Sequence, residues 1–220
     1  MIETPRIILF GKQGAGKGTQ AQLLLSRKNL EHLSTGDIFR AAIKQGTPAG
    51  KEARSYIDQG ELVPDDAVIR LVEEKFETTS ELITKGFVLD GFPRTQNQAY
   101  ALEKLLEKKN APLHCAINLE IDREVVLARL TGRRVCIECG TNYHIDNPPT
   151  KPWTCDVCGG EVRQRKDDSE LAINRRLDLY EKETAPLLRF YKERGLLKLV
   201  DAFGTTDEVY ARIDSVLQGL

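Results

Sequence analysis

The sequence predicts an α/β fold in which a parallel β-sheet of about five strands carries helices on both faces. Short apolar runs, each of a length that suits a buried strand, alternate along the chain with longer segments of helical periodicity. A glycine-rich loop lies between the first apolar run and the first helical segment. Because alternating strands and helices pack as a sheet between helical layers, these observations favour one core with helices on either side.

Apolar runs predict the strands and periodic segments predict the helices. The expected strands are Ile7–Phe10, Phe87–Leu89, His114–Leu119 and Leu196–Val200, with a shorter one near Leu30–Leu33. The expected helices are Lys17–Arg27, Gly36–Gln45, Gly50–Gln59, Asp65–Thr78, Gln96–Lys108, Asp122–Leu130, Ser169–Glu193 and Asp207–Leu217. Thr35 precedes one of these helices, and Pro64-Asp65-Asp66 begins another, as helix starts often do.

Two segments interrupt the alternation and read as insertions into the single core. Residues 35–64 are helical without an intervening strand. Residues 131–166 contain two pairs of cysteines, several prolines and glycines, and the only tryptophan, Trp153. No internal repeat, low-complexity tract or long linker separates independent domains.

The bulk composition is that of an ordinary soluble globule. The chain has 220 residues, 40% of them hydrophobic and 30% charged, with a net charge of −1. This charge balance gives no sign of a nucleic-acid-binding protein, and no apolar stretch approaches the length of a membrane span. The N-terminal residues run straight into the first strand and leave no room for a signal peptide, so we expect the cytosol.

The stretch Phe10-Gly11-Lys12-Gln13-Gly14-Ala15-Gly16-Lys17-Gly18-Thr19 predicts a phosphate-binding loop. It fits the pattern Gly-x4-Gly-Lys between a strand and a helix. Glycines let backbone N–H groups turn inward on an anion, the helix N-terminus adds partial positive charge, and Lys17 adds a full charge. Gly18 stands where a Ser or Thr that binds Mg²⁺ usually follows the lysine. We therefore expect the ion to depend more on waters and on the nucleotide's own phosphates. The plainer alternative is a surface glycine turn.

The segment Phe87-Val88-Leu89-Asp90-Gly91-Phe92-Pro93-Arg94 predicts a second site at a strand end. A buried strand that ends in Asp90 would place a carboxylate beside Mg²⁺ and its waters. Gly91 allows close backbone approach, and the planar guanidinium of Arg94 suits a phosphate. The alternatives are a helix cap or turn for Asp90 and a surface ion pair for Arg94.

Further anion contacts are suggested by a helix start and by scattered arginines. Thr35 and Arg40, in Ser34-Thr35-Gly36-Asp37-Ile38-Phe39-Arg40, are also explained by a helix cap and a solvated arginine. The scattered arginines are Arg129, Arg133, Arg134, Arg163, Arg165, Arg175 and Arg176. They form either an exposed, salt-bridged surface or a cluster on transferring phosphates, whose dispersed negative charge needs fixed cations.

Four of the five cysteines predict a structural zinc site. Cys136/Cys139 and Cys155/Cys158 form two Cys-x2-Cys pairs, each followed by a glycine. Four thiolates close the tetrahedral shell and leave no position for a catalytic water. Cys115 lies in an apolar run and reads as a buried small hydrophobe. The competing interpretation is a zinc ribbon that binds nucleic acid or protein. Acidic residues near the two Cys-x2-Cys pairs, however, offset the positive charge that such a ribbon would need.

Taken together, these motifs are similar to those of a known family: the chain resembles an adenylate kinase of the long-lid type. The resemblance is carried by Gly11-x-x-Gly14-Ala15-Gly16-Lys17-Gly18-Thr19, Ser34-Thr35-Gly36-Asp37, Asp90-Gly91-Phe92-Pro93-Arg94-Thr95 with Gln98, Gly132-Arg133-Arg134 and Arg165-Lys166-Asp167-Asp168. These motifs span residue 7 to about residue 180 and are highly specific as a set.

The resemblance implies reversible transfer of the γ-phosphoryl group of MgATP to AMP, giving two ADP, by a cytosolic monomer with no nucleic-acid or membrane partner. It implies a core of residues 1–34, 65–130 and 169–220, a mobile AMP-binding insertion of residues 35–64 and a mobile zinc-binding lid of residues 131–168. The alternatives are a kinase for another nucleoside monophosphate and, in another class, a non-catalytic zinc-ribbon module whose binding depends on nucleotide.

Roles for individual residues also follow from the resemblance. Matching ATP contacts are Gly14, Ala15, Gly16, Lys17, Gly18, Thr19, Arg129, Arg133, Tyr143 and Gly204. Matching AMP contacts are Thr35, Arg40, Glu61, Leu62, Val63, Gly91, Phe92, Pro93, Arg94, Gln98, Arg165 and Arg176, with Gln98 on the adenine edge. Matching catalytic residues are Lys17, Asp90, Arg94, Arg129, Arg165, Arg176 and Asp168, with Asp167 and Asp168 linking the closed lid to the site. Family members commonly carry proline, which would stiffen the loop, where this chain has Gln13.

Overall fold

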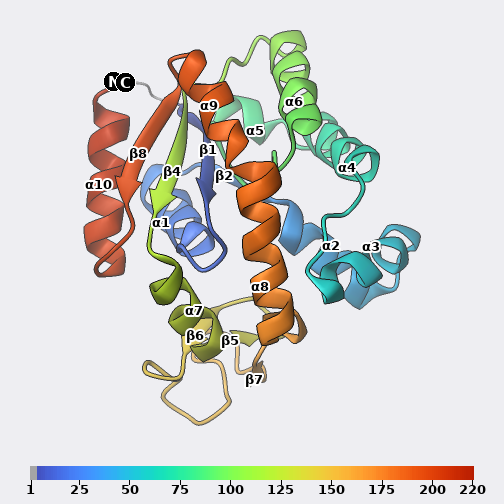
Figure 1. Cartoon of the computed structure of the whole chain (residues 1–220), viewed down its shortest axis with the longest axis vertical. Helices are drawn as coiled ribbons and strands as arrows, with labels where there is room; N and C mark the ends of the chain where they lie inside the picture. The colour runs from blue at the N-terminus through green and yellow to red at the C-terminus, as the bar shows by residue number, and fades with distance from the viewer. Residues whose placement is uncertain (1–3) are drawn as a thin grey trace.

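The central sheet has five parallel strands in the order β2-β3-β1-β4-β8 (Figure 1). The computed structural model describes residues 4–220. The strands are β1 (Arg6–Gly11), β2 (Glu31–Ser34), β3 (Phe87–Asp90), β4 (Cys115–Glu120) and β8 (Leu197–Asp201). The fold class and all five expected strands are confirmed, with ends that shift by one or a few residues. His114, expected in a strand, lies just before β4.

Helices cover both faces of this sheet and divide the core into two main clusters. On one face, α1 (Lys17–Lys28) and α10 (Thr206–Gln218) pack on the side chains of β1 and β4 that point to this face, such as Ile7 and Ile117. On the other face, residues such as Ile8 and Leu89 pack against α4 (Asp65–Thr78), α6 (Gln96–Lys108) and α9 (Pro186–Glu193). Successive residues of a strand point to opposite faces, so the continuous apolar run of β1 feeds both clusters.

The expected helix over 169–193 is not continuous, and this prediction was wrong. The structure has a short turn η1 (Lys166–Asp168), then α8 (Glu170–Leu179), a π-helical turn η2 (Tyr180–Thr184) and α9. Pro186 begins α9, where its missing N–H costs little, whereas inside a helix it would remove a hydrogen bond. In η2, Ala185 N donates to Tyr180 O at 2.7 Å. The short helix α5 (Glu81–Thr84) was not expected.

Two insertions leave the carboxyl edge of the sheet on different sides (Figure 1). The helical insertion, residues 35–64, contains α2 (Thr35–Gln45) and α3 (Pro48–Gln59). The cysteine insertion, residues 131–168, begins in the last turn of α7 (Arg123–Gly132) and contains an antiparallel sheet of β5 (Arg133–Cys136), β6 (Asn142–His144) and β7 (Val162–Arg163). Helix α8 leads from the cysteine insertion back to the core. None of the helices in residues 4–220 has the length and apolar character to cross a membrane.

Strand register brings the chemical groups of the sequence motifs to one edge. Leu9 of β1 and Ser34 of β2 both pair with Asp90, the last residue of β3. The phosphate loop, the Asp90 loop and the start of α2 therefore leave the sheet side by side. Open α/β sheets bind ligands at this carboxyl edge, near the strand where the winding direction reverses.

Candidate active site

The glycine-rich loop connects β1 to α1 and leaves the helix N-terminus free of side-chain caps. Gly16 is the N-cap with φ of 97°, a conformation that glycine adopts without strain. No side chain accepts a hydrogen bond from the first turn of α1. Its unpaired N–H groups and positive dipole end are therefore available to an anion. This geometry matches the phosphate-binding loop that the sequence predicts.

Lys17 is held by the loop in the centre of the site. Its Nζ donates to Gly11 O at 2.8 Å and to Lys12 O at 3.0 Å. Burial lowers the pKa of Lys17 to about 8, against the opposing effect of Asp90, while Arg94 and Arg176 lower it further. Lys17 is thus a desolvated cation whose charge an incoming anion would stabilise.

The Asp90 carboxylate lies next to the residue that replaces the usual hydroxyl. A Cβ built on Gly18 would be 3.7 Å from Asp90 Oδ2, and Thr19 is exposed. His32 Nε2 lies 3.9 Å from the same carboxylate oxygen. One carboxylate without a neighbouring hydroxyl ligand fits an ion held mainly by nucleotide phosphates and waters, as expected for Mg²⁺.

Arg94 is fixed at the turn that follows β3. Its Nε donates to Gly91 O at 3.0 Å, and Thr35 Oγ1 donates to the same carbonyl at 3.0 Å. Thr184 Oγ1, from η2, donates to Arg94 O at 3.0 Å. Burial lowers the pKa of Arg94, but a guanidinium stays charged at neutral pH. These contacts aim a rigid cation at the carboxyl edge of the sheet and favour the site interpretation over a surface ion pair.

One cavity, of about 80 Å³, joins these groups. Its lining includes Gln13 and Lys17 from the phosphate loop, Arg94 from the β3 loop, Arg176 from α8 and Leu62 from the helical insertion. Four segments far apart in the sequence thus meet around one space. Three of these five residues are cations, so the cavity is suited to a polyanionic ligand.

The expected arginine cluster forms in part. Arg133, Arg165 and Arg176 converge with Asp167 and Asp168, and burial is the main reason that the pKa values of Arg165 and Arg176 fall to about 10. Arg176 Nη2 lies 2.9 Å from Asp167 Oδ2.

The remaining arginines lie in other surroundings. Arg129 Nη2 donates to Ala202 O at 3.3 Å, close along the chain to Gly204. Arg134, Arg163 and Arg175 stay at the surface or pair locally: Arg134 with backbone carbonyls, Arg163 with Glu161, and Arg175 with Glu61 of the helical insertion. For Arg163 and Arg175 the salt-bridged surface interpretation holds, whereas Arg134 is half-buried and bonds only to backbone carbonyls.

Asp65 bonds to three side chains next to the Arg94 loop and was missed as a functional candidate. Its carboxylate accepts from Gln98 Nε2 at 2.7 Å, Thr95 Oγ1 at 2.8 Å and Asn97 Nδ2 at 3.2 Å. Gln98 is buried, and its Oε1 accepts from Arg94 N at 2.8 Å. Asp65 was interpreted only as a helix start. Its spacing from Gln98 in the sequence gives no signal of their contact. The predicted role of Gln98 on an adenine edge stays a prediction.

The helical insertion carries the other residues expected to contact the acceptor. Ser34 caps α2 by accepting from Asp37 N at 3.2 Å, and the next residue, Thr35, donates to Gly91 O. Arg40 Nη2 donates to Asp37 Oδ1 at 2.5 Å. Leu62 lines the cavity, while Glu61 pairs with Arg175 through its side chain.

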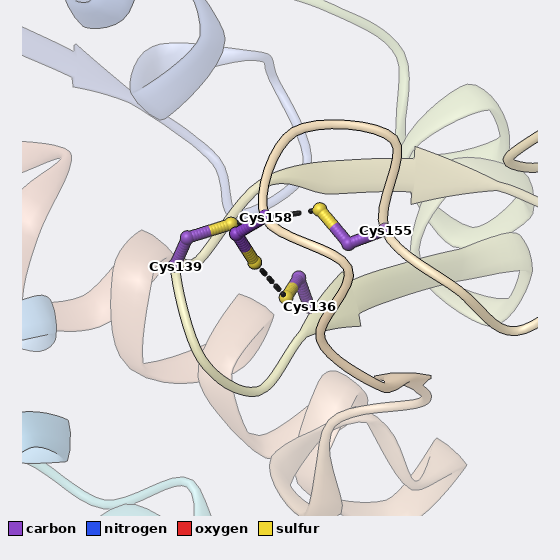
Figure 2. A group of neighbouring side chains, drawn as sticks. All are labelled: Cys136, Cys139, Cys155 and Cys158. Atoms are coloured by element: carbon purple, nitrogen blue, oxygen red, sulfur yellow. Dashed lines mark hydrogen bonds between the residues drawn. The ribbon is translucent and has the colours of Figure 1, made fainter.

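The four paired cysteines meet at one point of the cysteine insertion, as Figure 2 shows. Their Sγ atoms all lie within 4.8 Å of one another, with Cys136–Cys158 at 3.5 Å and Cys139–Cys155 at 3.6 Å. Sulfurs bound at about 2.3 Å around a tetrahedral zinc would be separated by about 3.8 Å. Four thiolates at these separations fit a closed structural zinc site.

Tyr143 contacts this cysteine cluster. Its hydroxyl donates to Cys155 Sγ at 3.3 Å and accepts from Asp156 N at 2.8 Å. Its predicted contact with ATP stays a prediction, and its support of the cysteine loop was not foreseen. The fifth cysteine, Cys115, is buried in β4, and burial raises the pKa of its thiol to about 12. Its burial confirms it as a core residue.

Fold and site together define a P-loop phosphotransferase: a parallel sheet, a phosphate loop with its lysine, and converging arginines at the carboxyl edge. The family model described as adenylate kinase matches residues 9–196. The adenylate kinase of Carboxydothermus hydrogenoformans is 49% identical over 214 residues, 97% of this chain and 99% of that protein. The adenylate kinases of Bacillus subtilis strain 168 and Clostridium botulinum strain 657 are 48% and 47% identical, over 97% and 96% of this chain and 98% of each relative. The chain belongs to the adenylate kinase family.

Proposed function

We propose that this protein is an adenylate kinase, which transfers the terminal phosphoryl group of MgATP reversibly to AMP and yields two ADP. The observation that carries the proposal is the cavity where Lys17, Arg94 and Arg176 meet. Phosphoryl transfer passes through a state with negative charge spread over several oxygens, which fixed cations stabilise. Family membership supports adenine nucleotides as the substrates of this site.

The two nucleotides enter from opposite sides of the cavity in this proposal. ATP lies on the phosphate loop, residues 14–19, with Lys17 on its phosphates, Arg133 above them and Arg129 with the backbone near Gly204 at its far end. AMP lies against α2 and the β3 loop, held by Thr35, Arg40, Arg94 and Gln98, and by residues 61–63 and 91–93. The phosphate groups then meet beside Lys17 and Arg176.

The proposed mechanism is positioning with electrostatic stabilisation and needs no covalent intermediate on the protein. Arg94, Arg165 and Arg176 hold phosphate oxygens in line and stabilise their charge. Mg²⁺ carried by the nucleotide would neutralise phosphate oxygens, and Asp90 is the residue that would hold its waters. The cations stay charged near neutral pH, which supports a site ready to receive its substrates.

Residues 35–64 and 131–168 act as two covers that close on the substrates. Contacts between them support this role: Lys44 Nζ on α2 lies 2.7 Å from Glu138 Oε2 in the cysteine insertion. Glu61 of the helical insertion also pairs with Arg175 of α8. Closure would exclude water, which otherwise competes with AMP for the phosphoryl group.

Zinc is the proposed metal of the cysteine insertion, held by Cys136, Cys139, Cys155 and Cys158. When bound there it links two loops of a small sheet that has only a minor apolar cluster of its own. The proposed form of the enzyme is a cytoplasmic monomer whose partners are ATP, AMP and ADP, without nucleic acid or membrane.

A phosphoacceptor screen tests the proposed function. With MgATP as the donor, AMP should be phosphorylated far faster than CMP, UMP or GMP, as measured by product separation. Lys17→Met should abolish almost all ADP formation from AMP while the protein stays folded. Preference for another monophosphate would identify the alternative kinase. Nucleotide binding without any phosphoryl transfer would support the non-catalytic module instead.

A further inference from the structure

Gln13 has a buried side-chain amide that the known motifs do not use. Its Oε1 and its Nε2 are both shielded from solvent, and neither has a hydrogen-bond partner in the structure. Among residues 4–220, it is the only side chain for which both polar atoms are buried in this way. Buried amides are normally paired because an unpaired one loses its hydrogen bonds to water without replacement. The unpaired amide of Gln13 therefore indicates that a ligand supplies its missing hydrogen bonds.

The cavity places this amide beside the cations of the site. Gln13 lines it together with Lys17, Arg94 and Arg176. A volume of about 80 Å³ is well above the roughly 10–15 Å³ that one water needs, so a polar group can enter it. The same cavity touches the phosphate loop and Leu62 of the helical insertion. Gln13 thus lies where the donor and acceptor phosphates would meet.

The two side-chain hydroxyl groups that line the same cavity are already bonded to protein. Tyr180 Oη donates to Asn118 Oδ1 at 3.2 Å, and Thr184 Oγ1 donates to Arg94 O. Lys12, the residue before Gln13, pairs with Glu181 of η2 at 3.3 Å. The loop is therefore anchored to the π-helical turn on one side of Gln13. Within residues 4–220, no protein group forms a hydrogen bond with the Gln13 amide.

We propose that the Gln13 amide binds the phosphoryl group at the point of transfer. Its Nε2 donates to a non-bridging phosphoryl oxygen of the nucleotide. The amide adds a donor without adding charge to a site that already holds three cations. This inference rests on the proposed function.

Two substitutions of similar size test the contact by removing the amide donor in different ways. Gln13→Met removes both hydrogen-bonding atoms, and Gln13→Glu replaces the donor with a negative charge. The probe is two adenosines joined by five phosphates, with binding measured by calorimetry. We expect Gln13→Met to weaken its binding about 10- to 100-fold, the range for hydrogen bonds to charged groups. We expect Gln13→Glu to weaken it more, while the melting temperature without nucleotide rises because a carboxylate joins three cations.

Steady-state kinetics give a second readout that a purely structural role would not move. With the contact on the transferring group, kcat should fall more than the KM for ATP or AMP changes. Gln218→Met, at the exposed end of α10, is the matched control and should leave binding and kcat unchanged. Unchanged probe binding in Gln13→Met, or binding by Gln13→Glu as tight as the parent's, would overturn the inference. If the parent binds the probe and phosphorylates AMP in those experiments, the proposed function survives that outcome. If the parent does neither, the proposed function itself fails.

Discussion

Arg133 and Asp168 form a two-point ion pair that ties the first strand of the cysteine insertion to the turn before α8. Arg133 Nε donates to Asp168 Oδ2 at 2.8 Å, and its Nη2 donates to Oδ1. The Asp168 side chain is fully buried, and Arg176 approaches it as well. The pair therefore couples the position of the insertion to an arginine that lines the active-site cavity.

Removing this carboxylate should be costly. We expect Asp168→Ala to lower the free energy of unfolding by about 3–5 kcal/mol, because Arg133 is left largely buried without its partner. Urea denaturation measures the change. Glu161→Ala, which breaks an exposed pair with Arg163, should stay within about 0.5 kcal/mol of the parent. Equal effects of the two substitutions would contradict the structural role of the buried pair.

The lowered pKa of Lys17 predicts proton uptake when nucleotide binds. An anionic ligand favours the charged ammonium and returns its pKa toward 10.5, so binding takes up about half a proton at pH 8 and about nine-tenths at pH 9. Affinity for ATP should therefore fall as the pH rises above 8. Calorimetry in buffers of different ionisation enthalpy measures the uptake.

Two comparisons complete this test. Lys17→Met should remove the uptake, and a parent protein without any uptake at pH 9 would argue against the buried position of Lys17. The effect of pH on folding stability through Lys17 is opposite to that of a lysine whose pKa is raised by folding. Between pH 8 and 10.5 the unfolded chain binds more protons at this residue, so the contribution of Lys17 to stability rises with pH.

Zinc removal should affect the cysteine insertion more than the core. We expect about one equivalent of zinc per chain by elemental analysis, and a strong chelator should lower the melting temperature while far-UV circular dichroism stays largely intact. Cys155→Ser should lose the metal. Cys115→Ala should keep it, because Cys115 lies in β4 away from the four clustered thiols, although the cavity it leaves lowers stability. A metal-free protein with an unchanged melting temperature would refute the stabilising role.

The Lys44–Glu138 pair between the two insertions should matter little in spite of its position. Both side chains are more than half exposed, at 58% and 54%, and such pairs contribute about 0.2–1 kcal/mol. Lys44→Ala should therefore change kcat by no more than about fivefold, and less in high salt. Lys51→Ala, an exposed lysine of α3, is the control. A loss of a hundredfold would show that this contact governs closure.

Much of the fold could be predicted because its signals are local. The apolar runs of β1, β3 and β4 are buried on both faces and stand out from the polar segments around them. The break at η2 was missed because Tyr180–Thr184 contains only one apolar residue, Tyr180, so no hydrophobic period marks the change from α-helix to π-helix, although Pro186 is a visible signal of a new helix. The short strands of the cysteine insertion carry polar residues such as Tyr143 and His144, so no alternation marks them.

The site was predictable where one motif holds its own geometry, as at Lys17, Asp90 and the four cysteines. It was not predictable where contacts join distant segments. Asp65 meets Gln98, and Thr184 meets Arg94, only after folding. Which arginines converge likewise depends on helix packing, which leaves Arg175 outside the cavity that Arg176 lines.

The central claim is that two nucleotides lie with their phosphates facing across one cationic cavity. The most direct test is binding of two adenosines joined by five phosphates, in competition with each substrate separately. This ligand should displace both ATP and AMP and should bind far more tightly than either, with one molecule per chain. Displacement of only one substrate, or no measurable binding, would contradict the account.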